Sequence, residues 1–252
     1  IIIFTCKIYN LISVYGCKYI HILIFLNPLI WNLSNRYMSD LFGLSILITS
    51  SYFMLRALNQ KEYISIHFFL IGILSGIRIS FVPFFLPSSI YFIWLYKMKK
   101  LNHMISYFLL GTLIWILPLV MITGFESFLQ VALKHIKGHF FIWGGSVLTN
   151  DLGYLFRSLK IFESIWADSL GNWWINRHWI TIINGFCLAI FLLNGIINLR
   201  SYKIRKEVIV LLICNFFYLI WIFFFQNIVY KPRHVIPFIP FIIMFVNSGI
   251  YF

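Results

Sequence analysis

Residues 125–178 read FESFLQVALKHIKGHFFIWGGSVLTNDLGYLFRSLKIFESIWADSLGNWWINRH, and this segment is the best indicator of the fold. It is the one long segment rich in polar residues in an otherwise apolar chain. It holds five cationic residues and four of the seven acidic ones, Glu126, Asp151, Glu163 and Asp168. Long apolar runs precede and follow it. The pattern therefore predicts a polar loop between two sets of membrane helices.

The composition is typical of an integral membrane protein. Of the 252 residues, 61% are hydrophobic and 11% are charged, and the mean hydropathy is +0.89. Soluble domains carry about 25% charged residues. The net charge of +13 would favour nucleic acid as a partner in a soluble protein. Because the cations here lie in short loops between apolar runs, we expect membrane lipids as partners and no nucleic acid.

The apolar runs indicate an all-α fold, a polytopic membrane helix bundle with about nine spanning segments. A spanning helix needs about 20 apolar residues. The candidate runs are 1–15, 19–31, 41–55, 63–77, 81–96, 104–124, 179–199, 208–229 and 235–252. The first five are short, which favours tilting or partial insertion. The expected organisation is membrane helices over 1–124, the polar loop over 125–178, and membrane helices over 179–252.

The loop charges predict which side each connector faces. Ten cations lie in one set of short loops: Lys18, Arg56, Lys61, Lys97, Lys99, Lys100, Arg200, Lys203, Arg205 and Lys206. The other set of short loops holds four: Arg36, Arg78, Lys231 and Arg233. Because positive loops stay in the cytoplasm, residues 125–178 are expected on the extracytoplasmic face of the plasma membrane. Within that loop, 125–136 and 154–170 show the periodicity of amphipathic helices that lie in the membrane interface.

Charged residues lie at the predicted outer ends of several helices. Asp40 precedes the run 41–55, where it either caps the helix or supplies an acid to the outer face. Arg78 lies between two apolar runs, where a cation either faces a partner or extends to the lipid headgroups. Lys231 and Arg233 precede the last run, and the same two interpretations apply. We take Arg78, Lys231 and Arg233 as candidate ligands of a lipid phosphate.

A second group of cations lies inside the polar loop. His135 and His139 share a helix face, and this spacing can bind zinc. However, residues 136–138 are Ile-Lys-Gly and offer no third ligand. We therefore expect no metal and no other cofactor, with a divalent cation as the disfavoured alternative. Lys134, His135 and His139 are interpreted as further ligands of the phosphate.

Four segments resemble the multi-spanning GT-C glycosyltransferases, the superfamily of protein O-mannosyltransferases and aminoarabinose transferases. They are NPLIWNLSNRYMSDLFGLSILI (27–48), GILSGIRISFVPFFLP (72–87), HIKGHFFIWGGS (135–146) and YKPRHVIPFIPFI (230–242). The resemblance implies a membrane enzyme that uses a polyprenyl-phosphate-linked sugar. It would transfer the sugar to a lipid, glycan or protein acceptor on the extracytoplasmic face.

The resemblance also implies a carboxylate base in the first extracytoplasmic loop, and no segment of this chain matches that loop. The chain has no initiator Met and begins inside an apolar run. We therefore expect an N-terminally truncated fragment whose base lies upstream of Ile1, with Asp40 in an orienting role. Two other functions stay open. One is an O-antigen polymerase or ligase, and the other is a transporter or flippase, for which inverted repeats and charges at mid-membrane depth are typical.

Overall fold

The computed structural model describes residues 1–13, 16–36, 38–96, 100–142, 146, 153–199, 206–229 and 231–251. In these ranges all regular structure is helical, which confirms the all-α prediction. The α-helices are α1 Ile2–Ile12, α2 Ile20–Phe25, α3 Pro28–Ser34, α4 Asp40–Asn59, α5 Tyr63–Ile77, α6 Leu86–Tyr96, α7 Leu101–Thr123, α8 Phe125–Lys137, α9 Tyr154–Glu163, α10 Thr181–Leu199, α11 Lys206–Phe225 and α12 Ile239–Ile250. Four short segments have other helical geometry, the 3-10 segments η1 Ile79–Phe85 and η4 Pro232–Phe238 and the π segments η2 Gly138–Ile142 and η3 Ser164–Ser169.

Six helices in the described ranges are long and apolar enough to cross a membrane, compared with about nine spanning segments predicted from the sequence. They are Asp40–Asn59, Ile79–Tyr96, Leu101–Thr123, Thr181–Asn198, Lys206–Phe225 and Pro232–Ile250. Helices α1 and α5 are apolar but shorter. At about 1.5 Å per residue, α5 extends about 22 Å, which is less than the roughly 30 Å of a hydrocarbon core.

The run 19–31, predicted as one span, is broken into α2 and α3. The break lies at Asn27, whose side chain accepts a hydrogen bond from the Ile30 amide at 3.1 Å. Pro28 occupies the first position of α3, a common arrangement at a helix start. The side-chain amide of Asn27 also donates a hydrogen bond to the Ser169 carbonyl at 2.8 Å. This contact attaches α3 to η3 of the polar loop.

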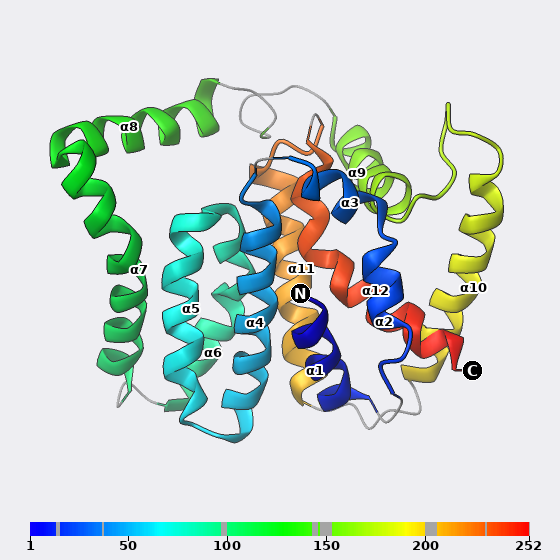
Figure 1. The fold of residues 1–252 in the computed structure, drawn as a ribbon, viewed down its shortest axis with the longest axis horizontal. Coiled ribbons are helices and arrows are strands. Elements are labelled where there is room, and N and C mark those ends of the chain that lie inside the picture. The colour runs from blue at the N-terminus through cyan, green and yellow to red at the C-terminus, as the bar shows by residue number, and fades with distance from the viewer. Residues whose placement is uncertain are drawn as a thin grey trace.

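The polar connectors gather at one end of the bundle, as Figure 1 shows. Helices α3, α8 and α9 lie at that end, and the α4–α5 connection lies at the other. Helix α8 turns away from α7 and runs across the end that holds α3 and α9, as a helix in the membrane interface would. The helices predicted over 125–136 and 154–170 are confirmed as α8 and as α9 continued by η3. Residues 143–145 and 147–152 of this loop lie outside the described residues.

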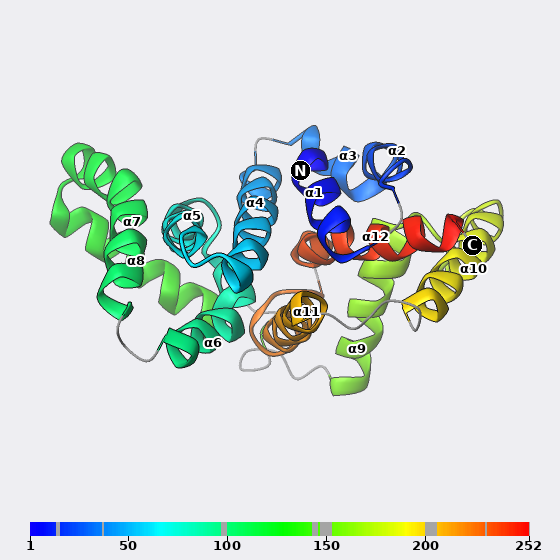
Figure 2. The ribbon, with the colours of Figure 1, turned by 90° about the horizontal axis from the view of Figure 1, so that it is seen from below.

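Two helix crossings depend on glycine. Viewed from below, α11 occupies the middle of the molecule, while α7 and α10 lie at its two sides (Figure 2). Helices α5 and α7 cross at Gly72 and Gly111, where an added Cβ would lie 2.2 Å and 2.1 Å from a backbone carbonyl oxygen of the other helix. Helices α10 and α12 cross at Gly195 and Gly249 with corresponding distances of 2.1 Å and 1.8 Å. Small residues let membrane helices approach closely, and here they attach both side helices to the core.

The α5–α7 crossing can be tested with Gly111→Ala. Alanine has the higher helix propensity, but its methyl group would collide with the Phe69 carbonyl of α5. We expect the free energy of unfolding in detergent to fall by about 1–3 kcal/mol. Gly153→Ala is the control, because no atom lies within 4 Å of an added Cβ there. Equal stability of the two variants in a denaturant titration would contradict the close crossing.

Candidate functional site

Asp40 is a buried carboxylate in the first turn of α4. The N-cap residue of this helix is Ser39, which makes no side-chain capping hydrogen bond. Asp40 is therefore the first helical residue, a position where the positive end of the helix dipole favours an anion. Its side chain is 0% exposed. A buried carboxylate needs charge partners or hydrogen bonds, and two arginines supply the charges.

Arg78 makes the closer ion pair with Asp40. It follows the last residue of α5, and its Nη2 atom lies 2.6 Å from Asp40 Oδ1. The stem of the arginine passes directly over α4 at Gly43, three residues after Asp40. A Cβ on Gly43 would lie 2.8 Å from the Cβ of Arg78. The absence of a side chain at Gly43 therefore lets Arg78 reach the start of α4.

Arg233 approaches the same carboxylate from η4. Its Nη1 atom lies 3.9 Å from Asp40 Oδ2 and 2.6 Å from the sulfur of Met38. The next residue, His234, is buried, and its carbonyl accepts a hydrogen bond from the Tyr218 hydroxyl of α11 at 3.2 Å. These contacts hold the first turn of η4 against both α4 and α11.

We call this group of residues the Asp40 cluster: Asp40, Arg78, Lys231, Arg233 and His234. Cations outnumber acids in it. The three permanent cations of the cluster all act electrostatically on the His234 ring. Burial lowers the pKa of Arg78, the charge of Asp40 raises it, and that of Arg233 lowers it. Arginine begins from a pKa above about 12, so it stays charged. One carboxylate is therefore paired with two arginines, and Lys231 adds a third cation near His234, so the excess positive charge favours an anionic ligand.

Several polar nitrogen atoms of this cluster are buried without a partner in the described part of the chain. They are Nε of Arg78, Nε of Arg233 and Nδ1 of His234. An unsatisfied buried polar group costs about 1–3 kcal/mol. A ligand with several acceptor oxygens, such as a phosphate, could remove part of that cost. Asp40, Arg78 and Arg233 were predicted one by one from the sequence, and the fold brings them together, with the exposed Lys231 within electrostatic range of His234.

The cations predicted within the polar loop separate into two places. Lys134 and His135 are exposed in the last turn of α8, where cations favour the negative end of the helix dipole. The helix geometry changes at Gly138, and η2 turns His139 towards the core. Burial lowers the pKa of His139, a hydrogen bond with the backbone of Phe225 raises it, and the charge of Lys231 lowers it. Of these loop residues, His139 lies beside the Asp40 cluster.

Sequence reasoning missed three contributors to this site. Gly43 carried a signal, because it lies three residues after Asp40 and therefore on the same face of α4. Tyr218 lies in the middle of an apolar run and carried none. Arg157 lies in the segment 154–170, which was predicted as an interfacial amphipathic helix, yet its side chain is fully buried. Among the described residues, no group of three or more His, Cys, Asp or Glu could hold a metal ion.

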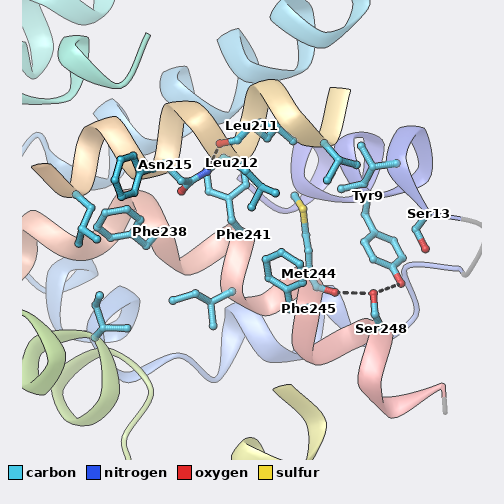
Figure 3. A pocket seen from close by; sticks show the side chains of 16 residues that line it. Tyr9, Ser13, Leu211, Leu212, Asn215, Phe238, Phe241, Met244, Phe245 and Ser248 are labelled. Carbon is cyan, nitrogen blue, oxygen red and sulfur yellow. Dashed lines mark hydrogen bonds between the residues drawn. The ribbon is translucent and has the colours of Figure 1, made fainter. Parts of the chain in front are cut away.

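The structure also holds an apolar groove of about 360 Å³, with walls formed by α1, α11, α12 and η3. Phe238, the last residue of η4, lies at one end of the groove (Figure 3). At the other end, the Tyr9 and Ser248 hydroxyl groups are hydrogen-bonded at 3.0 Å. From Phe238 to Ser248, α12 rises about 15 Å. Phe238 and Arg233 both belong to η4, five residues apart, so this segment links the cluster to the groove along the chain.

Comparison with known proteins adds no identification. No protein-family model, no curated protein and no solved structure matches this chain.

The contribution of Asp40 to the stability of the fold can be measured with Asp40→Asn. This substitution leaves Arg78 partly buried without its counter-ion, so we expect a loss of about 3 kcal/mol in the free energy of unfolding. Asp168→Asn is the matched control, because it removes the more exposed ion pair with Arg177 and should cost less than about 1 kcal/mol. Denaturant titration in detergent compares them. Similar losses in both variants would show that the Asp40 cluster does not hold the fold together.

Proposed function

We propose that this chain belongs to a membrane glycosyltransferase of the GT-C type, which transfers a sugar from a polyprenyl-phosphate-linked donor. The observation that carries the proposal is the cation-rich Asp40 cluster together with an apolar groove that Phe238, the last residue of η4, helps to line. The donor has the same two parts, an anionic phosphate and a long apolar chain. A phosphate in the cluster would receive charge-assisted hydrogen bonds from the guanidinium groups, and the groove would take the polyprenyl chain.

The proposed chemistry uses the cluster to stabilise the leaving group. An acceptor hydroxyl attacks the anomeric carbon of the sugar, and the bond from that carbon to the phosphate oxygen breaks. The polyprenyl phosphate leaves with added negative charge, which Arg78 and Arg233 stabilise as preorganised donors. The acceptor proton passes to a base. Asp40 is poorly placed for that step, because Arg78 already contacts its Oδ1 atom at 2.6 Å.

Asp40 therefore has an orienting role in this proposal, since it holds both guanidinium groups in place. The resemblance to GT-C enzymes assigns the base to the first extracytoplasmic loop of those enzymes, which no segment of this chain matches. The charge of the loops supports an extracytoplasmic position for the cluster, because the cation-rich loops belong to the other side. Lipid, glycan and protein acceptors are all compatible with this arrangement.

The other two candidate functions differ in their products. An O-antigen polymerase or ligase would use the cluster for the same lipid phosphate but would extend or attach a glycan chain. A transporter or flippase would move its lipid without breaking a bond. Against transport, the charges of the Asp40 cluster lie where helices begin and end rather than at mid-membrane depth. Product analysis in proteoliposomes separates the three functions.

Arg233→Gln tests the phosphate site. The closer Asp40–Arg78 ion pair stays intact, so the protein should keep its thermal stability in detergent. Transfer from radiolabelled polyprenyl-phosphate sugars should fall about 100-fold or more, because a preorganised donor to the leaving group is lost. Arg177→Gln is the control, since it removes a cation of the polar loop that lies outside the Asp40 cluster. It should leave transfer unchanged. Wild-type turnover by Arg233→Gln would refute the assignment.

Leu212→Trp tests the groove. Leu212 lines the groove and is 48% exposed, so an indole there would fill the groove without entering the core. We expect the KM for a long-chain donor to rise about tenfold or more, given a steric cost of about 1–3 kcal/mol. A short-chain donor should be affected little. Ile213→Trp is the control, because Ile213 is 49% exposed on the same helix but does not line the groove. Equal KM values for the two variants would exclude the groove as the chain site.

A further inference from the structure

Arg157 is buried on a helix whose apolar side chains point outward. On α9, Leu155, Leu159 and Phe162 are 76%, 48% and 53% exposed, whereas Arg157 is 0% exposed. The apolar face therefore points away from the protein, as in helices that lie in a membrane interface. The cation points inward, towards the end of α11. This is the reverse of the packing expected of a soluble amphipathic helix.

The guanidinium group of Arg157 caps α11. Its Nε atom donates to the Phe223 carbonyl at 2.5 Å, and its Nη2 atom donates to the Gln226 carbonyl at 2.7 Å. The last carbonyls of a helix lack partners within it, and they form the negative end of the helix dipole. Within the described ranges, no carboxylate pairs with Arg157. The end of α11 therefore takes the place of a counter-ion.

The capped end of α11 leads directly into the Asp40 cluster. The carbonyl of Gln226 accepts a second hydrogen bond, from the Ile228 amide at 3.0 Å. Ile228 is 1% exposed, so this short turn is packed against the core. The chain then continues into η4, which carries Arg233. Arg157 thus holds the segment that places Arg233 beside Asp40.

A second part of the polar loop meets the same helix end. The ring of His139 in η2 is hydrogen-bonded to the backbone of Phe225 and lies within electrostatic range of Lys231. Arg157 and His139 come from parts of the loop that are separated along the chain. Both contact the carboxyl end of α11, so the polar loop is coupled to the cluster at this point.

We propose that Arg157 is a positioning residue for the Asp40 cluster. By capping α11 it holds the turn after Gln226, and through that turn it sets the position of Arg233 at the anion site. Displacement of α9 would release the Gln226 carbonyl and let Arg233 move away from Asp40. The inference rests on the proposed function for the identity of the anion, but not for the effect on the turn.

The test compares Arg157→Met with Arg157→Lys and with Arg177→Met as the control. Arg157→Met keeps the length of the side chain but removes its charge and donors, and Arg157→Lys keeps the charge but loses the paired donors. Hydrogen–deuterium exchange of the full chain in detergent reports on residues 226–234. Isothermal titration with decyl phosphate reports on the anion site. Arg177 pairs with Asp168 in the same loop and does not contact α11 through any hydrogen bond or ion pair in the described part.

In Arg157→Met we expect about tenfold faster exchange over 226–234 and about tenfold weaker binding of decyl phosphate. Exchange in α4 and α5 should be unchanged. Arg157→Lys should show smaller effects of the same kind, which keeps the test valid if Arg157→Met fails to fold. Arg177→Met should change neither quantity.

Two different failures can be distinguished. Unchanged local exchange in both Arg157 variants, or faster exchange throughout the protein, would overturn the positioning role. Local loosening with unchanged decyl phosphate affinity would also overturn it, because Arg233 would then bind the anion without Arg157. Absence of decyl phosphate binding by the unmodified protein would overturn the proposed function instead, and the exchange data would still decide whether Arg157 positions the turn.

Discussion

The buried carboxylate of Asp40 is the interaction on which this arrangement depends. It joins parts of the chain that are far apart in sequence, the start of α4, the end of α5 and the 3-10 segment before α12. A carboxylate removed from solvent is strongly unfavourable without a charge partner. Arg78 at 2.6 Å is the partner that Asp40 requires, and Arg233 at 3.9 Å is a second, more distant one, so the carboxylate connects three helical segments. Gly43 makes the meeting sterically possible, because any side chain there would collide with Arg78.

The carboxyl end of α11 follows the same electrostatic logic. Its carbonyls receive Arg157 from α9, and the backbone of Phe225 receives His139 from η2. In a membrane protein, backbone polar groups must find partners within the protein where lipid replaces water. Cations from the polar loop meet that need while the apolar side chains of α9 face outward. The polar loop is therefore attached to the helix end that leads into the Asp40 cluster.

Features set by residues close together along the chain were predictable from the sequence, whereas contacts between distant segments were not. The helices over 125–136 and 154–170 were found from periodicity, since periodicity depends on neighbours along the chain. The run 19–31 looked continuous by hydropathy, but Asn27 and Pro28 start a new helix within it. Lys134, His135 and His139 formed one group in sequence. The change of helix geometry at Gly138 leaves the first two exposed and brings His139 to α11.

Composition, run length and charge distribution were enough to predict the helical class, several helices long and apolar enough to span a membrane, and the location of the polar loop. The sequence also identified Asp40, Arg78, Lys231 and Arg233 as unusual charges at helix ends. The packing of the helices shows in addition that Asp40, Arg78 and Arg233 meet, that Arg157 is buried and that η4 also reaches an apolar groove. Pairing of this kind depends on which helix ends are brought together across the bundle. That is a property of packing, which spacing along one chain does not encode.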